Sequence, residues 1–145
     1  MDNDDVLKVS VDYDRSVTDG IKGGRYDWFD PNITDAHFPN TRSVTSSLEV
    51  YIVEYGKCMS AKNVLANLDK RNLRPATLQE LLAVGEQYPD LQREFPIVAL
   101  GSVWQNAEGN RCVPCIVGGG SSRGLRLHWI GGDWGGLCRF AAVRR

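Results

Sequence analysis

The chain has 145 residues, of which 42% are hydrophobic and 24% are charged, and its formal net charge at pH 7 is −1. This composition excludes a disordered segment, a collagen-like repeat and a coiled coil, and the length is typical of one compact domain. The balanced charge argues against a dedicated nucleic-acid binder, whose affinity depends on a strongly basic face. We therefore expect a single domain over residues 1–145 that has no nucleic-acid partner.

The start of the chain indicates where the protein resides. The first residues, MDNDDVLKVSV, are acidic where a signal peptide would be basic. No apolar run approaches the roughly 18 residues that a membrane span requires. We therefore expect a cytoplasmic protein without a membrane partner. In that compartment the four cysteines are expected to be free thiols rather than disulfides.

The first half of the chain shows strand and helix patterns in turn. In residues 6–13, apolar side chains alternate with polar ones, which predicts a half-buried strand. Ser16 and Ser60 are typical N-cap residues, each placed just before a segment with helical periodicity. The elements expected after the first strand are therefore a helix over residues 16–22, a strand over 47–55 and a helix over 60–70.

Thr77 and Glu80 form the clearest local signal in the chain. A threonine followed three residues later by a glutamate is a capping box, in which each side chain accepts a hydrogen bond from the other residue's backbone N–H. It predicts the start of a helix, which we expect to end at Gly85. Pro75 prevents the preceding helix from continuing, so residues 73–76 are predicted to be a sharp joint between two helices.

The C-terminal part of the chain reads as short strands separated by turns. After a loop or single turn over residues 88–96, the strands are expected at residues 97–104, 111–117, 125–130 and 138–143. Glycine-rich loops are expected at residues 118–124 and 131–136. This order separates the helices from an antiparallel meander, so the predicted fold class is α+β.

The strand over residues 125–130 has two different sides. The apolar side, which we expect to face the core, consists of Leu125, Leu127 and Trp129. Arg126 and His128 lie on the other side, and we expect both to point outward. Trp134, in the loop that follows, is expected to be more exposed than Trp129.

Cys112 and Cys115 have the C-x-x-C spacing of zinc knuckles and dithiol redox sites. A redox site needs a helix after the first cysteine, and the glycines that follow cannot form one. A zinc site needs four ligands, so the pair would recruit Cys138, His128 or Cys58. Free thiols are the favoured interpretation, and a zinc-stabilised domain that uses Cys112, Cys115 and Cys138 remains the alternative. The chain has no catalytic or phosphate-binding motif, so we expect neither an enzyme nor a cofactor.

The last third of the chain differs from the rest in its charges. No lysine follows Lys70, and from Arg111 onward there are six arginines against a single acidic residue, Asp133. Arginine and tryptophan contribute much of the binding energy at interfaces, and glycine and serine give adaptable loops. A helical first part followed by such a segment is typical of a scaffold that carries a recognition face.

Several of these motifs resemble the C-type-lectin-like domains of bacteria. Residues 73–81, LRPATLQEL, are similar to the "W-R-L-P-T-x-x-E-L" helix entry of those domains. Residues 101–104, GSVW, are similar to their "G-G-S-W" strand, and residues 137–143 are similar to their closing strand. The chain also resembles small uncharacterised proteins of candidate-phylum bacteria with a similar "L-R-P-A-T-L-x-E-L-L" core. The resemblance implies a C-type-lectin-like fold whose first and last strands pair. The calcium–sugar signatures of true lectins are absent, so calcium-dependent sugar binding is not implied.

Within this group the chain is similar to the variable proteins of diversity-generating retroelements. In those proteins a reverse transcriptase rewrites codons near the 3′ end of the gene, and the changed side chains form a ligand-binding face. The resemblance thus implies a non-catalytic module that binds a protein or a small ligand through residues 111–138. The residues we expect to contribute are Arg111, Cys115, Ser122, Arg123, Arg126, His128, Asp133 and Trp134.

Overall fold

A computed structural model describes residues 4–40 and 45–145 of the chain. Its first elements are β1 (Asp5–Asp12), α1 (Val17–Gly24), β2 (Trp28–Phe29), β3 (Thr45–Glu54), β4 (Met59–Ser60), α2 (Ala61–Lys70), β5 (Leu73–Pro75) and α3 (Leu78–Gln87). The later elements are the 3-10 helix η1 (Leu91–Arg93), β6 (Ile97–Val98), β7 (Trp104–Gln105), β8 (Arg111–Gly118), β9 (Arg123–Trp129), β10 (Asp133–Trp134) and β11 (Arg139–Arg144). Helices and strands of one chain thus combine as predicted for the α+β class.

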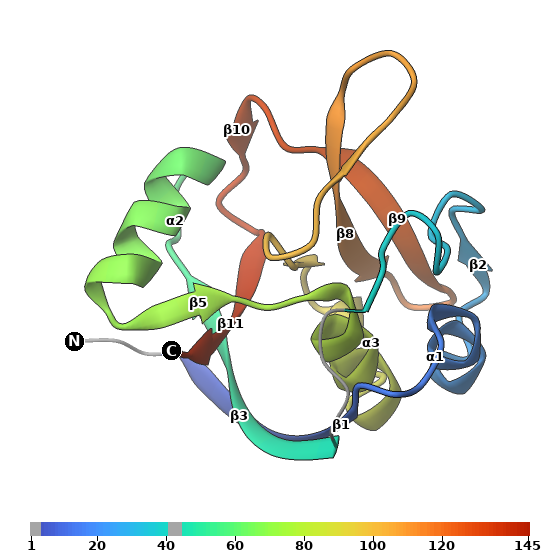
Figure 1. Ribbon diagram of the computed structural model, residues 1–145. Helices are drawn as coiled ribbons and strands as arrows, with labels where there is room; N and C mark the ends of the chain where they lie inside the picture. The colour runs from blue at the N-terminus through green and yellow to red at the C-terminus, as the bar shows by residue number, and fades with distance from the viewer. Residues whose placement is uncertain (1–3, 41–44) are drawn as a thin grey trace.

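One sheet organises these elements (Figure 1). Its hydrogen-bonded order is β1-β3-β11-β6-β8-β9-β2, with β5 paired to β11 and β7 paired to β8. Most pairs are antiparallel, but β11 pairs with β6, and β2 with β9, in parallel. Because β3 lies between β1 and β11, the direct pairing of first and last strands that the lectin-like resemblance implies is replaced by a three-strand arrangement.

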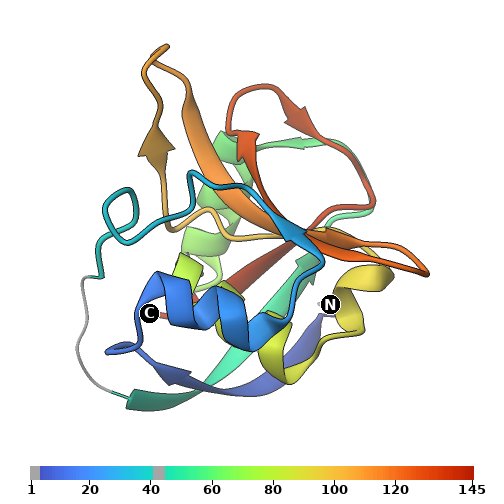
Figure 2. The ribbon, with the colours of Figure 1, turned by 90° about the vertical axis from the view of Figure 1, so that its right-hand side faces the viewer.

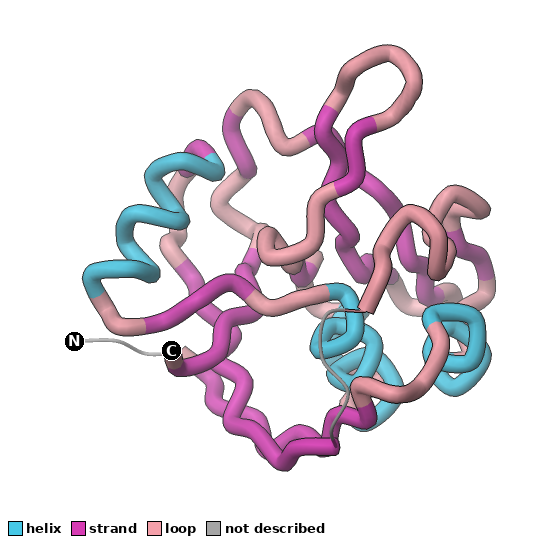
Figure 3. Tube along the Cα trace, viewed as in Figure 1, coloured by secondary structure: helices cyan, strands magenta, loops and turns pink. Residues whose placement is uncertain are grey.

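The sheet is covered on both faces, which we call the α1/α3 face and the α2 face. Alternation along β6 sends Ile97 into the cluster that packs on α1 and α3, and Val98 into the cluster that packs on α2. In β8 the same alternation places Ile116 on the α1/α3 face and Cys115 on the α2 face. Figures 1, 2 and 3 show α2 well apart from α1 and α3. None of the helices in the described ranges has the length and apolarity that crossing a membrane requires.

The local helix signals are confirmed. Ser16, Ser60 and Thr77 each accept a hydrogen bond from a backbone N–H in the first turn of α1, α2 and α3 respectively, and Glu80 completes the capping box. α3 continues to Gln87, two residues beyond its expected end at Gly85. Gly85 does not end the helix; its lack of a side chain leaves room for the Tyr26 ring, because a Cβ there would lie 2.1 Å from the Tyr26 hydroxyl oxygen.

Residues 73–76 are not the sharp joint that we predicted. Residues 73–75 form β5, which pairs with β11 so that Arg74 lies opposite Val143 and Pro75 opposite Ala142. Gly101 then packs against this segment, because its backbone N–H donates to the Ala76 carbonyl oxygen at 2.9 Å. Pro75 does end the helical path, but the open edge of β11 converts the connection into a strand.

The predicted positions of two tryptophans are wrong. Trp129 is 55% exposed, whereas Trp134 is only 4% exposed. Trp129 is the last residue of β9, beyond the part of the strand that packs on the helices. Trp134 belongs to β10, a strand inside the expected loop at residues 131–136, and pairing with Met59 of β4 draws it inward. β9 also starts earlier than expected, at Arg123, since the hairpin pairs Arg123 with Gly118.

Glu80 connects three elements on the α1/α3 side of the sheet. Its fully buried carboxylate accepts hydrogen bonds from Tyr13 Oη at 2.5 Å, from Arg74 Nη1 and Nη2 at 2.9 and 2.6 Å, and from Thr77 N at 2.8 Å. Burial by itself would raise the pKa of Glu80, but the hydrogen bonds from Arg74, Tyr13 and Thr77 outweigh it and hold the pKa below its usual value.

We expect Glu80→Gln to lower the free energy of unfolding by about 3–5 kcal/mol at pH 7, because it leaves the Arg74 guanidinium without its charge partner. A carboxyl group whose pKa is lowered by folding stabilises the protein above its unfolded-state pKa, and this contribution is lost as pH falls through the folded-state pKa. The difference between the two proteins should therefore shrink below about pH 4. Urea denaturation at several pH values measures it.

Glu86→Gln is the matched control on the same helix. Glu86 pairs with Arg15 at 2.6 Å, but about a third of each side chain is exposed. Solvent screens such a pair, so this substitution should cost no more than about 1 kcal/mol. Equal effects of the two substitutions, or a Glu80→Gln difference that is independent of pH, would contradict the structural role of Glu80.

Candidate ligand-binding site

The structure brings four of the predicted site residues together on the α2 face. Cys115 lies opposite Arg126 in the β8–β9 pair, and His128 follows Arg126 on the same side of β9. Cys115 also lies opposite Val98 of β6, which in turn lies opposite Phe140 of β11. Phe140, Val98, Cys115 and Arg126 therefore form one row across four strands. The row is apolar at its centre and ends in the Arg126 guanidinium.

Trp134 covers this row from the segment between β9 and β11. Its ring lies 4.6 Å from the His128 ring and 6.0 Å from the Phe140 ring, the latter in an edge-to-face arrangement. The short β10–β4 pairing holds Trp134 in this position. Figure 1 shows the β10 segment arching beside β9 and toward α2. The site is thus a strand surface with an aromatic cover.

Two polar atoms of this cluster are buried without a partner. Arg126 Nε and Trp134 Nε1 are shielded from solvent, and no described atom accepts a hydrogen bond from either. A buried donor without an acceptor costs about 1–3 kcal/mol. Both residues are neighbours of His128, so the two donors without an acceptor lie in one small region. An oxygen acceptor from a ligand would remove this cost.

The cysteine thiols near the site are held in their neutral form. Burial raises the pKa of Cys115 to about 12, although the Arg126 guanidinium opposes this change. Burial also raises the pKa of Cys138, and Arg126 again opposes it. Because the thiolate is the reactive form, neither sulfur is activated as a nucleophile at neutral pH.

The zinc alternative receives no geometric support. Cys112 and Cys115 are three positions apart, and in a strand this odd spacing places the two side chains on opposite faces of the sheet. Burial and the nearby Asp30 raise the pKa of Cys112 as well. Within residues 4–40 and 45–145, no three His, Cys, Asp or Glu side chains are grouped as metal ligands would be.

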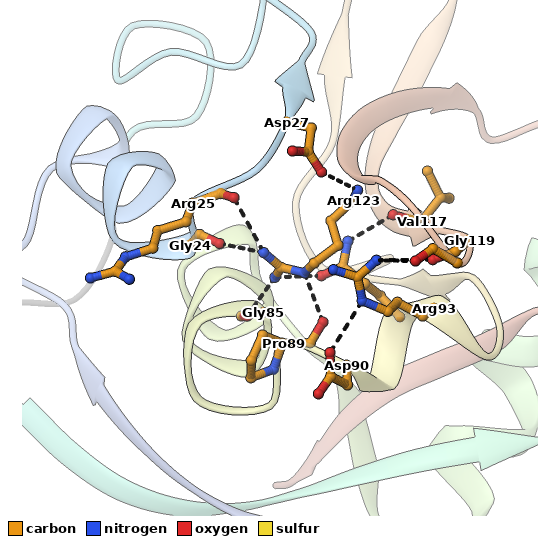
Figure 4. Close-up of polar contacts among 12 residues, drawn as sticks. Gly24, Arg25, Asp27, Gly85, Pro89, Asp90, Arg93, Val117, Gly119 and Arg123 are labelled. Atoms are coloured by element: carbon orange, nitrogen blue, oxygen red, sulfur yellow. Dashed lines mark hydrogen bonds and ion pairs between the residues drawn. The ribbon is translucent and has the colours of Figure 1, made fainter.

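Arg123 has a different role from the one we predicted (Figure 4). It is only 5% exposed. Its Nε donates to the Pro89 carbonyl oxygen at 2.7 Å, and Nη1 and Nη2 donate to the Gly24 and Gly85 carbonyl oxygens at 2.6 and 2.7 Å. Nη2 also donates to Gln92 Oε1 at 2.9 Å. Arg123 thus binds the chain's own backbone on the α1/α3 side, and its guanidinium does not face Arg126.

The remaining predicted residues do not join the cluster as a group. Arg111 and Ser122 lie at opposite ends of the β8–β9 hairpin, which are separated by about 20 Å at the usual rise of a strand. Asp133 is exposed beside Trp134 on β10. The sequence interpretation missed Val98 and Phe140, whose only signal is the alternation of their short strands.

Arg123 and Arg126 should respond differently to substitution. We expect Arg123→Ala to lower the free energy of unfolding by at least about 3 kcal/mol, because three buried carbonyl oxygens lose their donors. Arg126→Ala should change it by no more than about 1 kcal/mol, because the Nε that it removes has no partner. Urea denaturation of both variants is the measurement. An equally large loss in Arg126→Ala would make Arg126 a structural residue and remove it from the candidate site.

The chain was compared with protein families, curated proteins and solved structures. No protein-family model, curated protein or solved structure matches the chain. The C-type-lectin-like identity therefore stays a prediction. The candidate site is defined by its own residues: Arg126, His128 and Trp134 on the α2 face, with Cys115 beneath them.

Proposed function

We propose that the chain is a non-catalytic binding module whose recognition site is formed within residues 111–138 by Arg126, His128 and Trp134. The observation that carries this proposal is the pair of buried donors, Arg126 Nε and Trp134 Nε1, that have no acceptor among the described residues. Arg126 and His128 are only half-buried, so a ligand has access to them from solvent. The proposed site therefore presents two half-exposed side chains to solvent and holds, next to them, two buried donors that no described residue uses.

The chemistry of these groups favours a ligand with an anionic oxygen. A guanidinium forms its strongest hydrogen bonds with carboxylate and phosphate oxygens, and such charge-assisted bonds are stronger than neutral ones. The indole Nε1–H of Trp134 is a donor only, so it needs an acceptor as well. His128 supplies an aromatic surface between them. A carboxylate or phosphate on a small molecule or on a partner protein meets these requirements.

The state of the cysteines supports binding rather than catalysis. Cys115 is the one nucleophilic side chain in the Arg126 row, and burial keeps its thiol protonated at neutral pH. The acidic neighbour, Asp133, is on the exposed side of β10, where it is suited to contact a partner. These features support a recognition surface better than a reaction centre.

The proposal is tested by NMR, because both unpartnered donors carry observable N–H groups. We expect acetate or inorganic phosphate, added at constant ionic strength, to shift the Arg126 Nε–H and Trp134 Nε1–H signals along one saturation curve. The shared curve follows from a single anion that accepts hydrogen bonds from both groups. Trp134→Phe assigns the indole signal among the four tryptophans.

Two variants make this experiment decisive. Arg126→Gln should abolish the anion-dependent shift of the Trp134 signal, because it removes the cation. Arg111→Gln is the matched control, since Arg111 is exposed at the far end of β8 and should not affect the shift. Signals that fail to move with either anion, or a Trp134 shift that survives Arg126→Gln, would refute the proposed site.

We further propose a C-type-lectin-like scaffold whose C-terminal face is diversified by a retroelement. Contact between two segments that resemble the family supports this scaffold: Gly101 N donates to the Ala76 carbonyl oxygen, and Leu78 N donates to Ser102 Oγ. The composition of the segment between Cys112 and Cys138 supports diversification, because it is rich in residues that adenine-targeted mutagenesis produces.

Sequencing the last third of this gene in a natural population tests the diversification. We expect substitutions to accumulate at adenine-derived codons for exposed or half-exposed positions such as Arg126 and Asp133. Cys115 and Arg123 should be invariant, because both are buried and replacing them disturbs packing. Residues 73–104 should also be constant. Sparse changes spread evenly over the gene would contradict diversification and would leave the anion-binding proposal unaffected.

A further inference from the structure

A second candidate site lies on the other side of the sheet, between α1 and the segment of residues 29–34. We call it the α1 groove. It is a cavity of about 490 Å³, within the range of small-molecule sites. Its apolar lining comprises Ile21, Tyr26, Phe29, Pro31 and Ile33. Lys22 and Arg25 are the charged residues of the lining, which contains no acidic side chain.

The floor of the α1 groove is already formed. The Tyr26 ring packs where α1 meets α3, at two glycines whose Cβ atoms would lie within 2.4 Å of it at Gly24 and 2.1 Å at Gly85. The Arg123 guanidinium lies over the same ring, with its central carbon 4.9 Å from the ring centroid. An aromatic side chain held this firmly loses little further freedom when a ligand binds.

One wall of the groove is apolar and open to solvent. Phe29 is 49% exposed, and it lies on β2, the last strand in the sheet order. Ile33, in contrast, is buried beside it in the groove lining. Covering the exposed part of a phenyl ring with an apolar group is favourable, at roughly 25 cal/mol for each Å² removed from water. An apolar ligand body therefore gains free energy in this groove.

The cations of the groove are available to a ligand. Among the described residues, neither Lys22 nor Arg25 has an acidic side chain within ion-pair distance. Two acidic side chains that follow Arg25 in the sequence are used elsewhere, since Asp27 accepts from Arg123 N and Asp35 accepts from Val17 N. The groove thus combines an apolar body with two unpaired positive charges.

We infer that the α1 groove binds a small amphipathic carboxylic acid. Its apolar chain would lie against Tyr26, Phe29 and Ile33, and its carboxylate would contact Lys22 and Arg25. Charge complementarity selects this occupant, because two cations in an apolar lining disfavour a neutral lipid and repel a cationic amphiphile. This site is separate from the Arg126 site, and the inference does not rest on the proposed function.

Isothermal titration calorimetry with decanoate tests the inference. The titration uses the Arg126→Gln variant, which lacks the other anion site. In it we expect saturable binding of one decanoate per chain, much weaker binding of decylamine and no measurable binding of acetate. The double variant Lys22→Gln, Arg25→Gln should weaken decanoate binding at least about tenfold, because it removes both charge partners. Phe29→Ser should also weaken it, and the exposure of Phe29 means that this variant is expected to fold.

A matched double variant controls for the loss of charge. Lys62 and Lys70 are exposed on α2, and Lys70 lies in the last turn of α2 as Lys22 does in α1. In the same Arg126→Gln background, the double variant Lys62→Gln, Lys70→Gln should leave decanoate affinity unchanged. Equal binding of decanoate and decylamine, or equal effects of the two double variants, would overturn the inference. The absence of decanoate binding would overturn it as well. So would a dimer in sedimentation experiments that Phe29→Ser converts to a monomer, because a second copy of the chain would then cover the groove.

Discussion

The buried guanidinium of Arg123 is the interaction on which both candidate sites depend. It joins the end of α1, the end of α3 and the start of β9 through carbonyl oxygens of Gly24, Gly85 and Pro89. The same group lies over Tyr26, the floor of the α1 groove. Arg123 is also the first residue of β9, so the same hydrogen bonds hold the start of the strand that carries Arg126 and His128. One side chain thus positions two surfaces on opposite faces of the sheet.

The alternation of strands explains why similar residues have different roles. Arg123 and Arg126 are three positions apart on β9, so they point to opposite faces. One meets backbone carbonyl oxygens at the helix ends, and the other lies beside Cys115 with an unused donor. The same odd spacing separates Cys112 from Cys115. A C-x-x-C pair that would chelate zinc in a turn therefore cannot do so in this strand.

The sequence predicted the parts of the structure that depend on neighbouring residues. The caps at Ser16, Ser60 and Thr77 satisfy N–H groups within the next turn of the chain, so three or four residues contain the whole signal. The candidate site was predicted only in part. Arg126 and His128 were placed on one side of a strand correctly, but the cover by Trp134 was not foreseen, because it depends on the pairing of β10 with the distant β4.

The sequence by itself thus determined the helix starts, the apolar side of β1 and the order of the helices and longer strands. The tertiary structure decided what the connections and charged side chains do. Residues 73–75 became a strand because β11, about seventy residues later in the chain, offers them backbone partners. Arg123 became a structural residue because helix-end carbonyl oxygens surround it. Contacts of this kind arise only when distant segments meet, and no local pattern of residues records them.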